Sequence, residues 1–209
     1  MNPHARAEED LRVIRNLMER ATIYRAISAP TALVGGIASL IAAVVLPEAD
    51  PRRFIAGWLL VLILTLAANT WFIRQKARRE GGKIFSSGLR HAIRAASPAL
   101  LVTAVFTGSL WYETGGATIS VLMTTVWTLF YGLALLSTAT FAPRSLVILG
   151  WAFLVTSLAG QLVVDHVALI SNHSAGLLMG LTFGVYHLIY AATTWPRKRA
   201  VEAAQMSIE

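Results

Sequence analysis

The chain has 209 residues, of which 56% are hydrophobic and 14% charged, and its formal net charge is +7. A soluble domain carries about a quarter charged residues, so this composition favours an integral membrane protein. The chain has no cysteine, which excludes disulfides, iron–sulfur clusters and cysteine-bound zinc.

Six blocks without acidic or basic residues follow one another along the chain. They cover about 30–46, 54–73, 97–112, 117–141, 145–164 and 175–195. Most reach the ~20 residues that a helix needs to cross a ~30 Å hydrocarbon core. The third block is the shortest and can extend toward residue 92 if Arg94 snorkels to the headgroups. Because lipid leaves only helices or closed barrels, and no block alternates with period two, we predict an all-α domain of six transmembrane helices over 29–195.

Two basic stretches have apolar residues at helical spacing. Residues 1–28 contain one of them, and the connection of about 74–96 contains the other. We predict amphipathic helices that lie in the membrane interface, and a short tail over 196–209. The first apolar block begins after about 25 residues rich in Arg and Glu, which is too long and too mixed for a cleavable signal peptide.

The basic residues are distributed unevenly over the two sides of the predicted membrane domain. Arg52 and Arg53 lie on one side, and the other 16 of the 18 Lys and Arg residues lie on the opposite side. The positive-inside rule then places both termini in the cytoplasm. We therefore expect the protein to be integral to the plasma or inner membrane. The high charge is explained by topology and by attraction to anionic lipids on the cytoplasmic face, so we do not expect nucleic-acid binding.

The predicted helices repeat two short patterns. A small residue, Pro, two further residues and Leu-Val begin the odd-numbered helices at 29–34, 97–102 and 142–147. Thr followed by an aromatic residue ends the even-numbered ones, with Arg a few residues later. The patterns indicate three copies of one helical hairpin. Convergence is the alternative, since membrane interfaces favour Pro, Trp and Arg.

His187 stands between two tyrosines, Tyr186 and Tyr190, inside the last apolar block. A polar residue at this depth is costly unless it has a partner. Asn69 and the threonines of the fourth block, above all Thr124 and Thr128, could supply one. Two interpretations remain open: a neutral imidazole that joins two helices, or a member of a proton or solute path. No other histidine lies inside a span, which disfavours haem.

Small residues mark two helix faces that other backbones could approach closely. Gly176, Gly180 and Gly184 form a glycine zipper on the sixth helix, and Gly35 and Ser39 lie on the first. We expect helix packing at both faces, between copies of this chain or with a protein partner.

The predicted outer side collects several acids and two histidines. Asp165, His166 and His173 flank one short loop and could bind a zinc-like ion, although their spacing matches no strong ligand motif. Glu48, like the other outer acids, is expected to be a solvated loop residue.

The sequence carries no catalytic motif. It has no phosphate-binding glycine loop, no HExxH and no Gly-x-Ser-x-Gly. We therefore predict a non-enzymatic membrane protein that acts as a subunit, scaffold or membrane-embedded regulator. The alternative is a small-solute or proton-coupled transporter or channel with His187 in the path. No cofactor is indicated.

Overall fold

The structure is a computed structural model that describes residues 9, 11–12, 28–80, 87–140, 142–166 and 174–195. The described residues form six rod-like helical elements. The first five are α2 (Ala29–Val45), α3 (Pro51–Glu80), α4 (Ser87–Leu110), α5 (Ala117–Leu136) and α6 (Arg144–His166). The sixth has three consecutive parts, α7 (Ser174–Met179), the π-helical η1 (Gly180–Tyr186) and α8 (His187–Thr194). The predicted all-α class is therefore confirmed.

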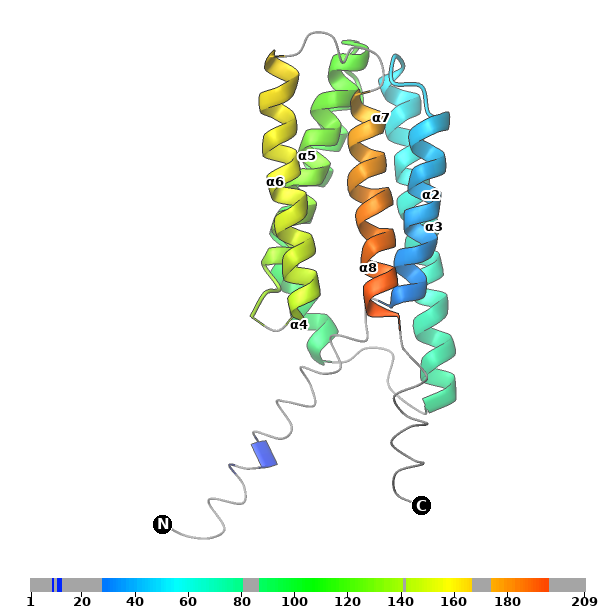
Figure 1. Ribbon diagram of the computed structural model, residues 1–209, viewed down its shortest axis with the longest axis vertical. Coiled ribbons are helices and arrows are strands. Elements are labelled where there is room, and N and C mark those ends of the chain that lie inside the picture. Colours follow the sequence, from blue (N-terminus) through cyan, green and yellow to red (C-terminus); the bar gives the residue numbers. More distant parts are fainter. Residues whose placement is uncertain are drawn as a thin grey trace.

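The six elements run side by side and alternate in direction (Figure 1). The turns 46–50 and 111–116 lie at the upper end in that view, together with the start of α7; we call this the Glu48 end. The starts of α2, α4 and α6 lie at the opposite end, which we call the Arg144 end. The predicted segments 1–28 and 196–209 fall almost entirely outside the described residues.

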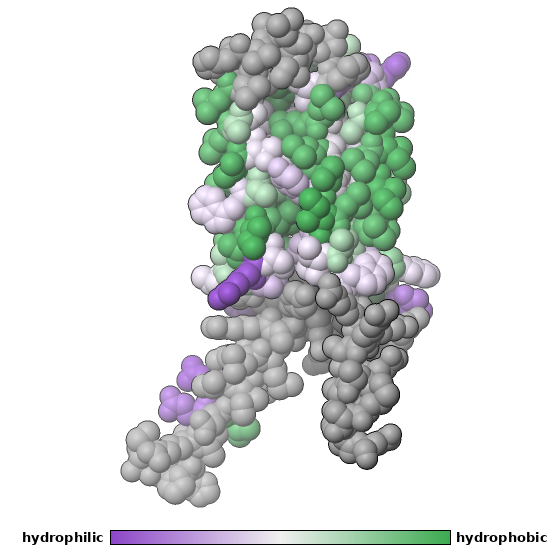
Figure 2. Space-filling view, viewed as in Figure 1, coloured by the Kyte–Doolittle hydropathy of each residue, from purple (hydrophilic) through white to green (hydrophobic). Residues whose placement is uncertain are grey.

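Four stretches are long and apolar enough to cross a membrane. They are Pro51–Gln75, Arg90–Leu110, Ala117–Leu136 and Ser174–Thr194. Two shorter apolar helices, Ala29–Val45 and Arg144–Gly160, complete the bundle. Figure 2 shows the result as a broad hydrophobic band on the face in view, with hydrophilic residues toward its ends. Exposed Trp71 and Trp195 at the Arg144 end fit an interfacial aromatic belt.

α4 differs from the expected arrangement because it is one continuous helix. The basic stretch before Pro98 and the apolar stretch after it form a single element, where we expected an interfacial helix followed by a separate span. Pro98 has no N–H for the carbonyl of Arg94, four residues earlier. The Ser97 hydroxyl donates to that carbonyl at 2.8 Å instead. Proline breaks helices partly because this carbonyl loses its hydrogen-bond donor, and the bond from Ser97 removes that penalty.

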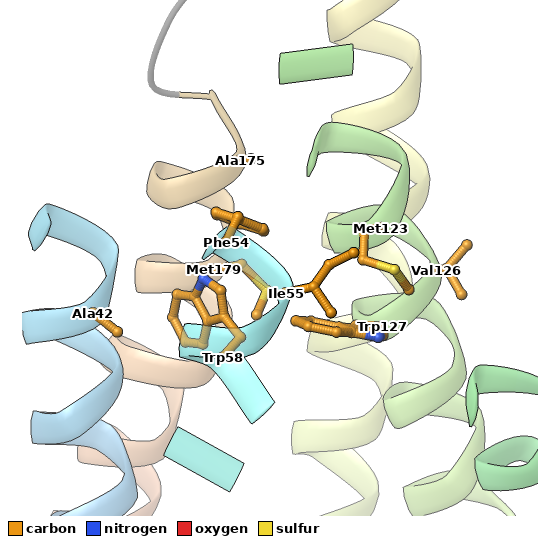
Figure 3. Close-up of a cluster of buried hydrophobic side chains, with 9 residues drawn as sticks. All are labelled: Ala42, Phe54, Ile55, Trp58, Met123, Val126, Trp127, Ala175 and Met179. Atoms are coloured by element: carbon orange, nitrogen blue, oxygen red, sulfur yellow. The ribbon is translucent and has the colours of Figure 1, made fainter. Parts of the chain in front are cut away.

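The core consists of two clusters of buried side chains, one toward each end. Figure 3 shows the cluster of the Glu48 end, in which the indole of Trp58 lies between Ala42 of α2 and Met179 of α7. The second cluster lies toward the Arg144 end and includes Phe153 and Tyr190. Phe183 of η1 packs against both clusters, so η1 joins the two halves of the core.

The predicted glycine zipper packs inside the chain, against α2. A Cβ at Gly176 would lie 2.7 Å from the Ala43 carbonyl oxygen, and one at Gly180 would lie 3.0 Å from the Ala43 Cβ. A Cβ at Gly184 would meet the Leu40 side chain at 2.6 Å. The close packing was expected, but its partner is an intramolecular helix, so this face is not available to a second protein.

The small residues predicted on the first helix are also covered within the chain. Gly35 faces Thr65 of α3, since a Cβ there would lie 3.0 Å from the Thr65 Cγ2. Ser39 is 3% exposed. Both faces therefore build the bundle itself.

Candidate functional site: a histidine-centred cluster in the bundle core

The turn before His187 is a π-helix, which has one more residue per hydrogen-bonded turn than an α-helix. η1 spans Gly180–Tyr186, and His187 begins α8 directly after it. Such short π segments in long helices are frequently found at functional sites.

Both ring nitrogens of His187 have partners. Nε2 lies 3.0 Å from the Tyr131 hydroxyl of α5, and Nδ1 lies 3.4 Å from the Thr182 carbonyl oxygen, five residues earlier. A carbonyl can only accept, so Nδ1 of the neutral imidazole donates to Thr182 and Nε2 accepts from Tyr131. This arrangement gives the half-buried imidazole a complete set of hydrogen bonds.

Aromatic rings surround the imidazole. The Phe183 ring stacks on it with centroids 6.0 Å apart and an interplanar angle of 10°. The rings of Tyr131 and Phe153 lie 5.7 Å from it. Because these rings come from α5, α6 and η1, the cluster links three elements with side chains that have few rotamers.

Tyr186 makes a second polar contact beside the cluster. Its hydroxyl lies 2.7 Å from the Thr156 hydroxyl of α6, and its ring packs edge-on against Phe153. Tyr190 is 4% exposed and belongs to the core cluster of the Arg144 end. All three members of the predicted Tyr186–His187–Tyr190 stretch thus contribute to the interior of the bundle.

The hydrogen bonds of the other predicted path residues do not go to His187 within the described part of the chain. Asn69 accepts a hydrogen bond from Thr31 of α2 at 3.1 Å, and Thr128 donates to the Thr124 carbonyl of its own helix at 2.8 Å. The Thr124 hydroxyl has no partner among the described residues. The structure therefore gives His187 a partner that sequence reasoning missed, Tyr131, although a buried tyrosine hydroxyl that needs a partner was a signal for it.

A second buried polar site lies at the Glu48 end. Glu48 is 5% exposed, so the expectation of a solvated loop residue was wrong. Its carboxylate accepts hydrogen bonds from the backbone N–H groups of Ala175, at 3.1 Å, and Gly176, at 2.7 Å. These N–H groups have no acceptor within the helix because they lie in the first turn of α7, and a negative charge is favourable there. The backbone of Glu48 is held too, because its carbonyl accepts from Ser120 at 2.8 Å.

The predicted outer metal site extends beyond the described residues. Asp165 and His166 are the last residues of α6, and His173 is outside the described part. Within the described part, no group of three or more acidic or histidine side chains could hold a metal ion.

Comparisons with known protein families, with curated proteins and with solved structures find no match to this chain.

Proposed function

We propose that this chain is a six-span integral membrane protein with both termini in the cytoplasm, which acts through contacts as a subunit, scaffold or membrane-embedded regulator. Six spans are supported by the two 17-residue apolar helices, Ala29–Val45 and Arg144–Gly160. They run beside the longer spans and reach the lower limit of ~17 residues for crossing a membrane. The three consecutive antiparallel hairpins, each starting at the Arg144 end, agree with a repeated hairpin unit.

The proposed orientation is supported by where the exposed arginines lie. Arg74, Arg90, Arg94 and Arg144 are exposed toward the Arg144 end, which would then face the cytoplasm. Each basic residue near an anionic membrane surface contributes about 1 kcal/mol of attraction. These residues also offer a basic surface to a partner.

The observation that carries the proposal is the exposure of α4. No residue of its apolar stretch Arg90–Leu110 is buried. In the most apolar 18-residue windows of the other three long stretches, the buried share is 17% for Pro51–Gln75, 50% for Ala117–Leu136 and 44% for Ser174–Thr194. One face of α4, which we call the α4 face, consists of exposed residues at helical spacing: Ser97, Leu101, Ala104, Val105 and Gly108.

The α4 face resembles a helix contact more than a lipid-facing surface. A Cβ at Gly108 would meet no atom within 4 Å, and Ala104 stands one turn earlier. Glycine weakens a helix by about 1 kcal/mol relative to alanine, and a lipid-facing position gains nothing in return. Small residues four apart are typical of faces where a second transmembrane helix packs closely. We therefore assign the α4 face to a transmembrane helix of a partner or of a second copy.

A photo-crosslinking amino acid at Leu101 is expected to capture a protein partner in the native membrane. The same amino acid at Val155 of α6, which is similarly exposed (58% against 66%), is the matched control and should give only lipid adducts. Adding Gly108→Leu should lower the crosslinking yield at Leu101 about tenfold, which corresponds to a loss of ~1.4 kcal/mol of binding free energy. This substitution should not unfold the protein. Equal yields at the two positions would contradict the proposal.

A second candidate function is a small-solute or proton-coupled path through His187. Its specific support is the bond between His187 Nε2 and the Tyr131 hydroxyl, since two groups that each donate and accept can relay a proton. In liposomes with a trapped pH dye, His187→Ala is expected to abolish pH-dependent flux, and Tyr131→Phe should reduce it. A wild-type protein that moves nothing over a range of solutes and pH values would remove this candidate.

A further inference from the structure

Two arginines continue the α4 face toward the start of the helix. Arg90 and Arg94 stand seven residues before Ser97 and Leu101. The spacing then alternates between three and four residues over positions 90, 94, 97, 101, 104 and 108. At 100° per residue, these six positions lie within about 80° around the helix, and all six residues are exposed. We call this set of six residues the α4 seam.

The α4 seam points away from the helix against which α4 packs. The Trp127 indole of α5 donates to the Thr107 hydroxyl of α4 at 2.9 Å. Ala99, Thr103 and Leu110 are half-buried, and they lie about 140–180° around the helix from the centre of the seam. The seam is therefore on the side of α4 opposite α5, where another helix can pack against it.

The two arginines of the α4 seam lack a counter-charge within the described part of the chain. Their guanidinium groups form no ion pair with a described side chain. Apart from Glu9, the acidic side chains that the structure describes are Glu48, Asp50 and Glu113, and these belong to the turns of the Glu48 end. The seam thus combines a small-residue stretch with an uncompensated positive charge at the opposite end.

The depth of Arg94 favours a specific counter-ion. Arg94 lies about 24 Å along the helix axis from Leu110, which places it near the boundary of a ~30 Å hydrocarbon core. Charges interact more strongly there than in water because the dielectric constant is lower. A carboxylate suits a guanidinium best, since it can accept two parallel hydrogen bonds from it.

A second copy of α4 does not fit this seam. Copies of a membrane protein share one orientation, so a two-fold dimer has its axis along the membrane normal and pairs the same helix in parallel. In a parallel pair with this spacing, equivalent residues face each other. Arg90 and Arg94 would then each lie opposite the same arginine, and such contacts between like charges disfavour the pair.

We propose that the α4 seam binds a transmembrane helix of a different protein, which carries an aspartate or glutamate at its cytoplasmic end opposite Arg94. Ala104 and Gly108 let that helix approach closely, and the ion pair fixes its depth and register. The inference rests on the proposed function, to which it adds the chemistry of the partner.

The photo-crosslinking amino acid at Leu101, in the full-length protein in its native membrane, tests the role of the charge. Arg94→Gln is expected to lower the yield of the adduct with another protein about tenfold, which corresponds to ~1.4 kcal/mol of binding free energy. Arg144→Gln removes an exposed arginine of α6 at the same end, so it is the matched control and should leave the yield unchanged. Once the adduct identifies the partner, Arg94→Glu combined with an arginine at the partner's acid should restore the yield.

Self-association is tested separately with a single cysteine. The chain has no cysteine of its own, so Leu101→Cys reports directly whether two copies meet at the seam. We expect no disulfide-linked dimer under mild oxidation in the native membrane. A dimer whose yield rises with Arg94→Gln, because the like charges are removed, would overturn the proposal.

The outcomes separate this inference from the proposed function. An adduct with another protein that does not depend on Arg94 rejects the acidic partner helix and leaves the proposed function standing, as a dimer through Leu101→Cys does. Lipid adducts alone at Leu101 reject both, and the arginines then bind lipid phosphates.

Discussion

Replacing Glu48 with alanine is expected to lower the free energy of unfolding by about 3 kcal/mol. The carboxylate accepts two hydrogen bonds from the first turn of α7. Hydrogen bonds to charged groups contribute about 1.5–3 kcal/mol each to the free energy of unfolding. Alanine also removes the favourable contact of a negative charge with a helix N-terminus. The N–H groups of Ala175 and Gly176 would stay buried without an acceptor.

Unfolding in detergent, followed by circular dichroism, measures this change, and hydrogen exchange at Ala175 and Gly176 locates it. Glu113 is an exposed acid at the same end of the bundle, so Glu113→Ala is the matched control and should change stability by about 0.5 kcal/mol or less. Glu48→Gln keeps one acceptor and should fall between the two. If Glu48→Ala is as stable as the control, the carboxylate does not hold α7.

Gly176→Ala is expected to destabilise the protein by a similar amount, about 3 kcal/mol. The new methyl group would lie 2.7 Å from the Ala43 carbonyl oxygen and 2.9 Å from Glu48 Oε1. A backbone carbonyl cannot move aside, so α7 would have to shift away from α2 and stretch its bond to Glu48. Overpacking costs about 1–3 kcal/mol, and the weakened cap adds to it.

The control for Gly176→Ala is Gly160→Ala on α6, where the nearest atom to a new Cβ is 3.5 Å away. This control should be neutral or stabilising by up to about 1 kcal/mol, because alanine favours helix. Gly176→Ala and Glu48→Ala share one contact, so the double variant should cost less than the sum of the two. Additive effects, or an unchanged stability of Gly176→Ala, would contradict the proposed close contact at the Glu48 end.

The helices themselves could be predicted from the sequence, because their apolar blocks are long and free of charge. The end of α8 at Thr194 and the start of α2 near Pro30 follow from their interfacial residues. The start of α4 could not be placed, because proline predicts a helix start and the bond from Ser97 that lets the helix continue is a detail of side-chain geometry.

The two polar sites were harder to predict because they depend on which elements become neighbours. His187 was recognised as a polar residue that needs a partner, but its partner is Tyr131, whereas Asn69 bonds to Thr31. Glu48 looks like any loop acid in the sequence. Its burial follows only when the start of α7 lies beside the turn after α2.

The packing of the glycine zipper changes where a partner would bind. Gly176, Gly180 and Gly184 lie against α2, so substitutions there should act on stability first. The open face around Gly108 is the surface that we propose for a helix contact, and exposed arginines stand at the start of the same helix. These features are why we favour a protein that works through contacts over one that works through a path.

Native mass spectrometry of the full-length protein, extracted gently from its own membrane without added ligand, tests this proposal most directly. We expect a defined complex with another chain or a second copy, which Gly108→Leu dissociates and Val155→Leu leaves intact. A monomer that carries a bound small molecule would contradict it and would favour the path through His187.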